Sequence, residues 1–359
     1  MKVIEPEVAL LLPPDPARPE QVYKLIETIG RVCYKSEDKI TDDSYERFIN
    51  VLKKNKHWAM LEHYIFILEV PVEIYNGLMS EITQYSSTDP MFQHYVSFFR
   101  FSVIEDKNKD LHAIVSMSAT AINYLWDTTV LTVFPKSMFA QLCSWMELKY
   151  GLLIKRPEQA NDISLAFIPN DVRKSFNKIK VLDTTELAAY VHDDISLGIY
   201  MTHASMTVKW ITDRGNSHEI VRHRPASYAQ ESTRYVMYAG DKCGNEITCI
   251  RPVFFEYGSE KYLQWKLACE EAETAYKELV RLGCTAQEAR DVLPNSLKTE
   301  IVMTARLTEW KHFFKMRVPK SAHPEMRQIS IPTMQAMTAA EALLLGEENA
   351  IKMFGGIEE

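Results

Sequence analysis

The stretch from Arg222 to Tyr235 constrains this chain more than any other part of it. It reads RHRPASYAQESTRY and gathers Arg222, Arg224 and Arg234 among small hydroxyl and amide side chains, in a protein whose net charge is −7. An arginine fork suits phosphate oxygens or a carboxylate, and small hydroxyl residues let backbone amides approach the same group. The stretch therefore predicts a site for an anionic ligand. A solvated basic surface with ion pairs is the alternative that the pattern alone leaves open.

Length and composition limit the class of protein. A chain of 359 residues can bury a large core, and its acidic balance argues against a general nucleic-acid binder, which would carry a basic stripe. The six cysteines are irregularly spaced without a CxxC pair, so we expect no metal site, no disulfide framework and a cytoplasmic location. No apolar run reaches the roughly 18 residues of a spanning helix, so no membrane contact is predicted.

Hydrophobic periodicity predicts helices and strands in the N-terminal half. Residues 19–32 carry apolar side chains at helical spacing, and Asp42 or Asp43 can cap a helix that runs through Leu52. Residues 64–70 are β-branched and aromatic, which is typical of a strand. The following segments predict a helix over 72–85, a strand over 95–104, a helix over 113–126, a helix over 135–150 and a polar, irregular stretch over 155–180.

The patterns in the C-terminal half are more regular. Residues 206–212 alternate as a strand, and 213–221 lead into the arginine-rich stretch as a short helix. Thr285 and Glu288 have the spacing of a capping box and open another short helix. The remaining predictions are a helix over 259–283 that Gly283 ends, a strand over 299–305, a helix from Thr308 to Arg317, and a helix over 326–345 that Pro332 kinks or delays.

The arginine-rich stretch resembles the signature of the flavin-dependent thymidylate synthases (ThyX), which is RHR, seven residues, a serine and then an Arg-Tyr pair. Here RHR at 222–224 is followed by residues 225–231, Ser232 and the pair at 234–235. The resemblance extends to RVCY at 31–34, HWAMLEH at 57–63 and the segment 288–327. It implies an α+β, ThyX-like fold with helices flanking an antiparallel sheet. It also implies a single domain over 1–359 with an insertion over 73–201, between the N-terminal part and the RHR motif.

The same resemblance implies an activity. It is the reductive methylation of dUMP to dTMP, with 5,10-methylenetetrahydrofolate as carbon donor, NADPH as reductant and FAD as hydride carrier. Because the flavin performs the redox step, the chain has to hold anionic ligands and polarise the pyrimidine, without a metal or a cysteine nucleophile. The chain has no GxGxxG stretch, so no Rossmann site is expected for NADPH. Family members form homotetramers with active sites between subunits, and that assembly is expected here.

Individual roles follow from the matching positions. Arg317 matches the arginine on the uracil ring, where a fixed guanidinium would stabilise negative charge at N3 and the adjacent carbonyl oxygen. Ser232 is assigned to binding, because no general-base signature that would make it a nucleophile surrounds it. The nucleotide-binding set is Glu219, Arg222, Gln230, Glu231, Ser232, Thr233, Arg234, Arg290 and Arg317. The flavin-binding set is Ser205, Arg222, His223, Arg224, Gln230, Arg306 and His312.

The sequence leaves one histidine and the exact activity undecided. Counting back from RHR puts His203 at the flavin-site histidine of the family, whereas counting through HWAMLEH gives His63. The acid that precedes the signature serine has moved one position along, so Gln230 is followed by Glu231. Two rival classes therefore stay open. One is a diverged flavin or nucleotide-binding enzyme without methylation, and the other is an RNA-binding module that stacks bases on the tyrosines of the signature.

Overall fold

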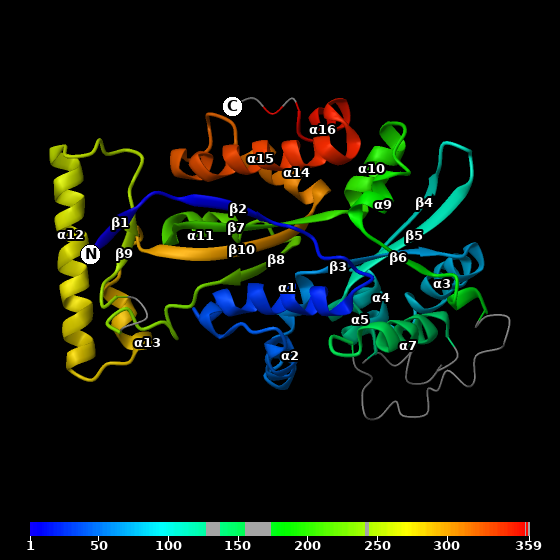
Figure 1. The fold of residues 1–359 in the computed structure, drawn as a ribbon, viewed down its shortest axis with the longest axis horizontal. Coiled ribbons are helices and arrows are strands. Elements are labelled where there is room, and N and C mark those ends of the chain that lie inside the picture. The colour runs from blue at the N-terminus through cyan, green and yellow to red at the C-terminus, as the bar shows by residue number, and fades with distance from the viewer. Residues whose placement is uncertain (127–136, 155–173, 241–243, 356, 358–359) are drawn as a thin grey trace.

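The computed structural model describes residues 1–359 except 127–136, 155–173, 241–243, 356 and 358–359. The described strands form two four-stranded sheets and one two-stranded sheet. Both four-stranded sheets are antiparallel throughout, and helices pack around them (Figure 1). The predicted mixture of helices with antiparallel sheets is therefore confirmed. The two-stranded sheet is different, because β1 (Lys2–Ile4) and β9 (Thr248–Ile250) pair in parallel.

The central sheet holds the arginine-rich stretch. Its strands are β2 (Glu7–Leu11), β7 (Ser205–Asp213), β10 (Lys298–Arg306) and β8 (Ala226–Gln230), in that order. Strands β7 and β10 pair along their whole length, from Arg306 opposite Ser205 to Lys298 opposite Asp213. Strand β8 was not predicted. It is only five residues long and takes its strand conformation from pairing with β10.

Helices cover both faces of the central sheet. On one side lie α14 (Leu307–Arg317), α15 (Pro324–Leu345) and α16 (Glu347–Phe354), and α1 (Pro19–Val32) lies on the other (Figure 1). Trp210 of β7 packs against Trp310 and Phe313 of α14, with ring centroids 5.7 and 5.8 Å apart. The indole of Trp210 also donates a hydrogen bond of 2.9 Å to the Thr333 hydroxyl of α15. This buried contact fixes the position of α14, whose last residue is Arg317.

The segment 73–201 and the strand before it build the second sheet. Its strands are β4 (Arg100–Glu105), β5 (Leu111–Ser118), β3 (Ile65–Val70) and β6 (Lys180–Leu182), in that order. The described helices that lie within residues 73–201 or cross its ends are α3 (Val72–Tyr85), α4 (Pro90–Val96), α5 (Ala119–Trp126), α7 (Met138–Tyr150), α9 (Thr184–Ala188) and α10 (Asp194–His203). Its buried side chains, such as Leu78 and Phe139, belong to the same hydrophobic cluster as Ile26 of α1 and Phe48 of α2 (Ser44–Lys54).

A smaller unit lies at one end of the central sheet, at the left of Figure 1. It contains α12 (Glu260–Arg281), α13 (Ala286–Ala289) and the paired strands β1 and β9. Thr285 and Glu288 form the predicted reciprocal capping box at the start of α13.

Single 3₁₀ turns occur at η1 (Glu37–Lys39), η2 (Trp58–Glu62) and η6 (Arg290–Val292). The connection between β7 and β8 contains α11 (Arg214–Ile220).

Several predicted elements are confirmed with small changes at their ends. The helices expected over 19–32 and 72–85 begin and end as predicted. The remaining matches are α2, α11, α12, α13, β3, β7 and β10. Helix α7 begins at Met138 rather than 135, and residues 135–136 lie outside the described part of the chain. Most of the stretch predicted to be irregular over 155–180 also lies outside it.

Two predictions in the inserted segment are wrong. Residues 95–104 were expected to be one strand, but α4 extends to Val96 and β4 begins at Arg100. Helix α4 forms because Asp89 accepts hydrogen bonds from the amides of Met91 and Phe92 and a proline occupies the first turn. Residues 113–118 were expected to be helical but form most of β5, because strands β3 and β4 pair with both of its edges.

Two details of the last helices also differ from the predictions. Helix α14 begins at Leu307, without a side-chain cap from Thr308. Helix α15 begins at Pro324 and includes Pro332, so the late start is wrong, whereas the kink at Pro332 stays a prediction. Pro324 occupies the first turn, where the missing amide hydrogen is not needed. The helices of the described residues include none that is long and apolar enough to cross a membrane.

The shared core leads to a prediction about the inserted segment. We expect Leu78→Ala to lower the free energy of unfolding by about 2–5 kcal/mol, because Leu78 is fully buried and the deletion leaves a cavity. If residues 73–201 belong to the same domain as α1 and α2, thermal unfolding will remain a single transition at a lower temperature. Leu148→Ala, at a side chain of α7 that is 70% exposed, is the control. A separate early transition in Leu78→Ala alone would contradict the single-domain prediction.

Candidate active site

Arg317, at the end of α14, is held by two residues of the RHR region. Its Nε donates to His223 Nε2 at 3.0 Å, its Nη1 donates to the Glu219 carboxylate at 2.5 Å, and its Nη2 donates to the Glu219 carbonyl oxygen at 3.1 Å. A guanidinium carries five N–H donors. Three of the five are used by these contacts, so two remain for a ligand. The protein therefore orients Arg317 while leaving two of its N–H donors available.

His223 is the buried member of the RHR motif. Its ring packs against Phe313 and His312, with centroids 4.7 and 5.8 Å apart. Burial, together with the charges of Arg317 and His312, lowers the pKa of His223 to about 4. The imidazole is therefore neutral at pH 7, and its Nε2 can accept the hydrogen bond from Arg317. Arg222 and Arg224, on either side of His223, are exposed.

A tyrosine hydroxyl holds the turn that separates the RHR motif from β8. The Tyr228 hydroxyl lies 3.0 Å from the carbonyl oxygen of Ile220 and 2.5 Å from that of His223, and the two oxygens share its single O–H donor. These bonds connect the end of α11 to the strand that follows the motif. The Tyr228 hydroxyl thus has a structural role, and the side chain is only partly accessible to solvent.

A second group of predicted residues lies near α13. Arg234 donates from Nε to the side-chain oxygen of Gln287 at 3.0 Å, and Gln287 lies three residues before Arg290. Both arginines are accessible to solvent. The backbone amide of Ser232 donates to the carbonyl oxygen of Cys33 at 3.1 Å, so the RVCY segment contacts the second half of the signature. Thr233, beside Ser232, is buried.

Glu231 and Gln230 are used for internal contacts. The buried Glu231 carboxylate accepts from Lys298 at 2.7 Å and from the Tyr238 hydroxyl at 3.1 Å. Gln230 donates to the Thr299 hydroxyl at 3.2 Å. Lys298 also binds Glu300, which Lys35 and Lys209 contact as well. Although burial alone would raise it, the surrounding lysines hold the pKa of Glu300 well below its usual range.

A third group surrounds a cavity of about 430 Å³, which Arg224, Ser227 and Arg306 line. Arg306 donates from Nη1 to the Ser116 hydroxyl at 2.7 Å and to the carbonyl oxygens of Thr202 and His203 at 3.0 and 3.4 Å. None of these acceptors is charged. Burial and then the neighbouring Arg100 lower the pKa of Arg306 to about 9, so the side chain is still cationic at pH 7.

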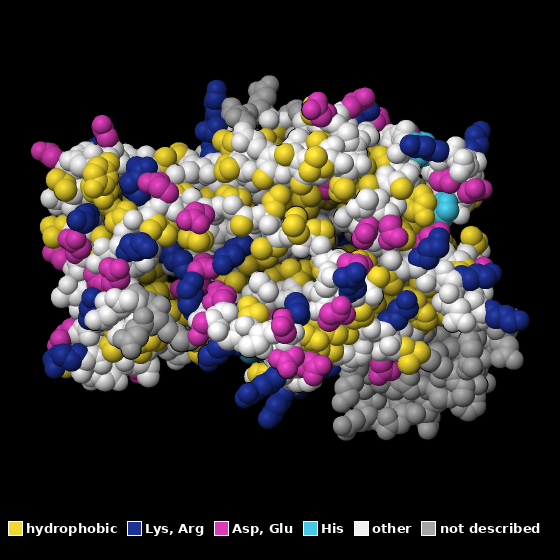
Figure 2. Space-filling view, viewed as in Figure 1, with side chains coloured by type: hydrophobic (Ala, Val, Ile, Leu, Met, Phe, Trp, Pro, Cys, Tyr) yellow, Lys and Arg dark blue, Asp and Glu magenta, His cyan; other side chains and the backbone are white. Residues whose placement is uncertain are grey.

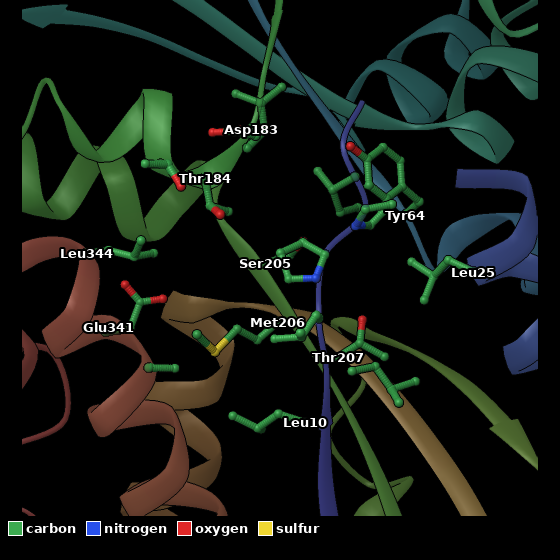
Figure 3. Close-up of a pocket in the computed structure, with 18 of the residues that line it drawn as sticks. Leu10, Leu25, Tyr64, Asp183, Thr184, Ser205, Met206, Thr207, Glu341 and Leu344 are labelled. Atoms are coloured by element: carbon green, nitrogen blue, oxygen red, sulfur yellow. The ribbon is translucent and has the colours of Figure 1, made fainter. Parts of the chain in front are cut away.

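A fourth group lines a separate, mostly apolar cavity of about 310 Å³ (Figure 3). Ser205 and Thr207 come from β7, Tyr64 and Leu25 lie on one side, and Glu341 of α15 lies on the other. The Glu341 carboxylate accepts a hydrogen bond of 2.9 Å from the hydroxyl of Tyr200. Burial raises the pKa of Glu341 to about 7. Ser205 is the only member of the predicted flavin set among the residues that line this cavity.

The two candidate histidines have similar surroundings. His63 shares a hydrogen bond of 2.8 Å between its Nδ1 and the Thr304 hydroxyl, and His203 shares one of 2.8 Å with the Ser116 hydroxyl. Both are buried, and neither Nε2 has a hydrogen-bond partner among the described residues. Burial lowers the pKa of His63 to about 4 and that of His203 to about 3. His63 lines the apolar cavity with Ser205, whereas His203 lies next to Arg306.

The predicted nucleotide-binding arginines fall into two groups within one chain. Glu219 links Arg317 to the RHR region, and Gln287 links Arg234 to the helix that leads to Arg290. Glu219 lines a further cavity of about 530 Å³, but none of these arginines lines that cavity, the 430 Å³ cavity or the 310 Å³ cavity. The single chain therefore does not bring these arginines together around any of those three cavities of the described structure.

Comparison with known proteins identifies the class to which this fold and these residues belong. Residues 158–340, just over half of the chain, match the family described as "Thymidylate synthase complementing protein". The chain therefore belongs to this family, and the resemblance of its signature to the flavin-dependent thymidylate synthases is confirmed.

Particular relatives carry the name flavin-dependent thymidylate synthase. The protein from Pyrococcus furiosus is 33% identical over 169 residues, which are 47% of this chain and 63% of the relative. The protein from Pyrococcus abyssi is 32% identical over 175 residues, covering 47% and 69%. The protein from Geobacter sulfurreducens is 33% identical over 158 residues, covering 43% and 66%. The chain thus spans roughly two thirds of the length of these relatives.

A solved structure is also similar in part. The UMP/dUMP methylase PolB from Streptomyces cacaoi, bound with 5-Br dUMP, is 22% identical and aligns with 47% of this chain and 84% of that one. The TM-score is 0.35, which is too low to place individual residues.

Sequence reasoning missed several residues of these groups. Arg100 and Ser116 lie in the inserted segment, where no motif marks them. Glu341 lies in a helix whose pattern indicated only a core or interface role. Lys298 and Lys209, by contrast, alternate with apolar residues on the strands β10 and β7. That alternation could have placed them on one face of the sheet, although not next to Glu231 and Glu300.

The buried carboxyl group of Glu341 predicts a pH-dependent stability. Its pKa is about 7 in the folded chain and near its ordinary 4.5 when unfolded. The contribution of Glu341 to the free energy of unfolding is therefore fully present below about pH 4.5 and is lost as the pH rises to about 7. Glutamine is neutral at every pH. We therefore expect the free energy of unfolding of Glu341→Gln, relative to that of the parent protein, to rise by up to about 3 kcal/mol between pH 5 and pH 8. Urea unfolding at both pH values measures this.

Glu347→Gln, at an exposed glutamate of the next helix, is the matched control and should show no such gain. A difference between Glu341→Gln and the parent protein that does not change with pH would show that Glu341 is ionised in the folded chain.

Proposed function

We propose that this protein is a flavin-dependent thymidylate synthase that methylates dUMP to dTMP. The observation that carries the proposal is Arg317, which is fixed by Glu219 and His223 of the RHR region and keeps two N–H donors for a ligand. Family membership and the names of the relatives support the same activity. In the overall reaction, dUMP, methylenetetrahydrofolate, NADPH and a proton give dTMP, tetrahydrofolate and NADP⁺.

The residues of the 430 Å³ cavity fit an anionic cofactor. Arg224 and Arg306 both line it, and neither has an ion pair with a carboxylate in the described part of the chain. Arg224 is exposed, but Arg306 is largely buried, and a buried cation without such a partner favours a bound anion. FAD, when bound, supplies the transfer of hydride from NADPH to the reacting carbon. The predicted flavin residues Arg222, His223, Gln230, His312 and Ser205 lie outside this cavity, and Ser205 lines the neighbouring one.

The role of Arg317 is electrostatic. A uracil ring that accepts a hydride at C6 develops negative charge at N3 and the adjacent carbonyl oxygen, and a fixed guanidinium stabilises that charge without having to reorganise. Glu219 and His223 hold Arg317 from one side, so its remaining donors point in a fixed direction. His223 is neutral, so it positions the guanidinium without adding a second positive charge. Both residues are positioning residues for Arg317.

We further propose that the active site forms between subunits of a homotetramer. Arg234 and Arg290 are accessible, and neither shares a hydrogen-bond partner with Arg317 among the described residues, so a site shared between subunits would join the two groups around one nucleotide. Leu12 and Leu343, which line the mouth of the apolar cavity, are 83% and 89% exposed. Leu344 lines the same cavity and is also exposed, and contiguous exposed apolar surface of this kind marks association sites. The described cysteines are free thiols, which fits a cytoplasmic protein.

The RNA-binding alternative has little support. Basic and acidic side chains are mixed over the face shown in Figure 2, without a basic stripe. Tyr228, one of the two tyrosines expected to stack bases, is bonded to backbone carbonyls. Formation of dTMP from dUMP, methylenetetrahydrofolate and NADPH, with and without added FAD, tests the proposed function. Flavin binding without dTMP would instead favour the diverged enzyme, and absence of both would remove the proposal.

The proposed role of Arg317 predicts a specific loss. We expect Arg317→Ala to lower kcat roughly 10²- to 10³-fold, as for removal of a fixed donor to a developing oxyanion, with FAD binding unchanged. Arg317→Lys keeps the charge but loses the forked contact to Glu219, so its kcat should be intermediate. Steady-state kinetics and a flavin titration measure the two effects. A kcat equal to that of the parent protein in Arg317→Ala would remove the assigned role.

The proposed assembly predicts complementation between two variants. We expect Arg234→Ala to raise the KM for dUMP roughly tenfold or more through loss of a charge-assisted bond to phosphate, and Arg281→Ala on α12 to leave it unchanged. If Arg234 and Arg317 of one site come from different subunits, Arg234→Ala and Arg317→Ala mixed after unfolding and refolding should regain about a quarter of the intact sites. No recovery in the mixture would contradict a shared site.

A further inference from the structure

The inserted segment contributes a third arginine to the 430 Å³ cavity. Arg224 belongs to the RHR motif, Arg306 ends β10, and Arg100 is the first residue of β4 in the segment 73–201. The same segment supplies Phe98 and Tyr124 to the cavity wall. Side chains from three distant parts of the sequence therefore surround one space, which we call the arginine cavity.

Pairing between two inserted strands places Arg100 close to Arg306. In the antiparallel pair of β4 and β5, Arg100 lies directly opposite Ser116. The Ser116 hydroxyl accepts the hydrogen bond of 2.7 Å from Arg306. Arg100 itself donates from Nη1 to the carbonyl oxygens of Ser97 and Phe99, at 2.8 and 2.9 Å. Both guanidinium groups are thus fixed by neutral acceptors on the same side of the cavity.

The positive charge of these arginines is only partly balanced by the protein. Arg100, Arg224 and Arg306 form no ion pair with a carboxylate among the residues that the structure describes. Glu62 and Glu309 also line the cavity, but Glu62 accepts from Ser227, and burial raises its pKa. Three guanidinium groups therefore line the cavity with two carboxylates, of which Glu309 lies near enough to Arg306 to stabilise its charge. Guanidinium groups arranged in this way suit a phosphate or diphosphate.

We propose that Arg100 binds the diphosphate of the flavin dinucleotide together with Arg224 and Arg306. The inserted segment then completes, from within the same chain, a cofactor site that the signature residues only begin. Phe98, which is 46% exposed, lines the same cavity and adds an aromatic side chain that can contact the rings of that ligand. This inference rests on the proposed function, because it takes the ligand to be FAD.

The test compares two flavins that differ in their phosphates. Apoprotein of the full chain is titrated with FAD and with riboflavin, which has the isoalloxazine ring and no phosphate, and binding is followed by flavin fluorescence. We expect Arg100→Gln to raise the Kd for FAD roughly 10- to 100-fold, as for loss of a hydrogen bond to a charged group. The Kd for riboflavin should stay within about twofold of the value for the parent protein, because riboflavin has no phosphate to lose.

Two further variants make the test decisive. Arg47→Gln, at an exposed arginine of α2, changes the net charge equally and should leave both dissociation constants unchanged. Arg100→Lys retains the charge and should bind FAD with intermediate affinity, even if Arg100→Gln folds poorly. Arg100→Gln that binds FAD like the parent protein, or that loses FAD and riboflavin equally, would overturn the role of Arg100 and leave the proposed function intact. A parent protein that binds no FAD would overturn both.

Discussion

The antiparallel pairing of β7 with β10 is the interaction on which the other contacts depend. A continuous ladder runs from Arg306 opposite Ser205 to Lys298 opposite Asp213. At one end it places Arg306 beside the arginine cavity, with Ser205 at the neighbouring apolar cavity. At the other end Asp213 caps α11, which leads to the RHR motif. Both functional regions are therefore attached to the ends of one rigid ladder, and a shift in its register would move both together.

The structure fixes its arginines in two different ways. Arg317 forms an ion pair with Glu219, so most of its charge is balanced within the chain and its remaining donors are available for a neutral ring that becomes negative. The hydrogen bonds of Arg306 go to a hydroxyl and to carbonyl oxygens, so no ion pair among the described residues neutralises its charge. The first arrangement suits stabilisation of charge that appears during a reaction, and the second suits a ligand that is already an anion.

The segment 73–201 is connected to the rest of the molecule by more than its ends. Its buried side chains share one hydrophobic cluster with α1 and α2, and Ser116 of its sheet holds Arg306 of the central sheet. A segment attached in this way cannot move freely relative to the cavity that it lines. These contacts support the prediction that residues 73–201 belong to the same domain as the central sheet and help to position the proposed site.

The sequence by itself determined the family, most of the long elements and the residue types of the site. Regular periodicity gave the ends of α1 and α3, and the spacing of RHR, Ser232 and Arg234 gave the resemblance that the family match confirms. These features are local, because each depends on residues within a few turns or one strand. Only the tertiary structure decided that β8 and β5 are strands, because their neighbours on the sheet supply the pairing.

Tertiary contacts also decided how the charged residues are used. Glu231 has the sequence position of a ligand-binding acid, but Lys298 and Tyr238 occupy its carboxylate. Arg100 carries no motif, yet strand pairing brings it to the cavity that Arg306 lines. Charge compensation depends on which side chains meet in space, and residues far apart in the chain meet only after the sheets have formed. The sequence pattern therefore indicated the residue types of the site, and the tertiary structure determined which side chains contact each other.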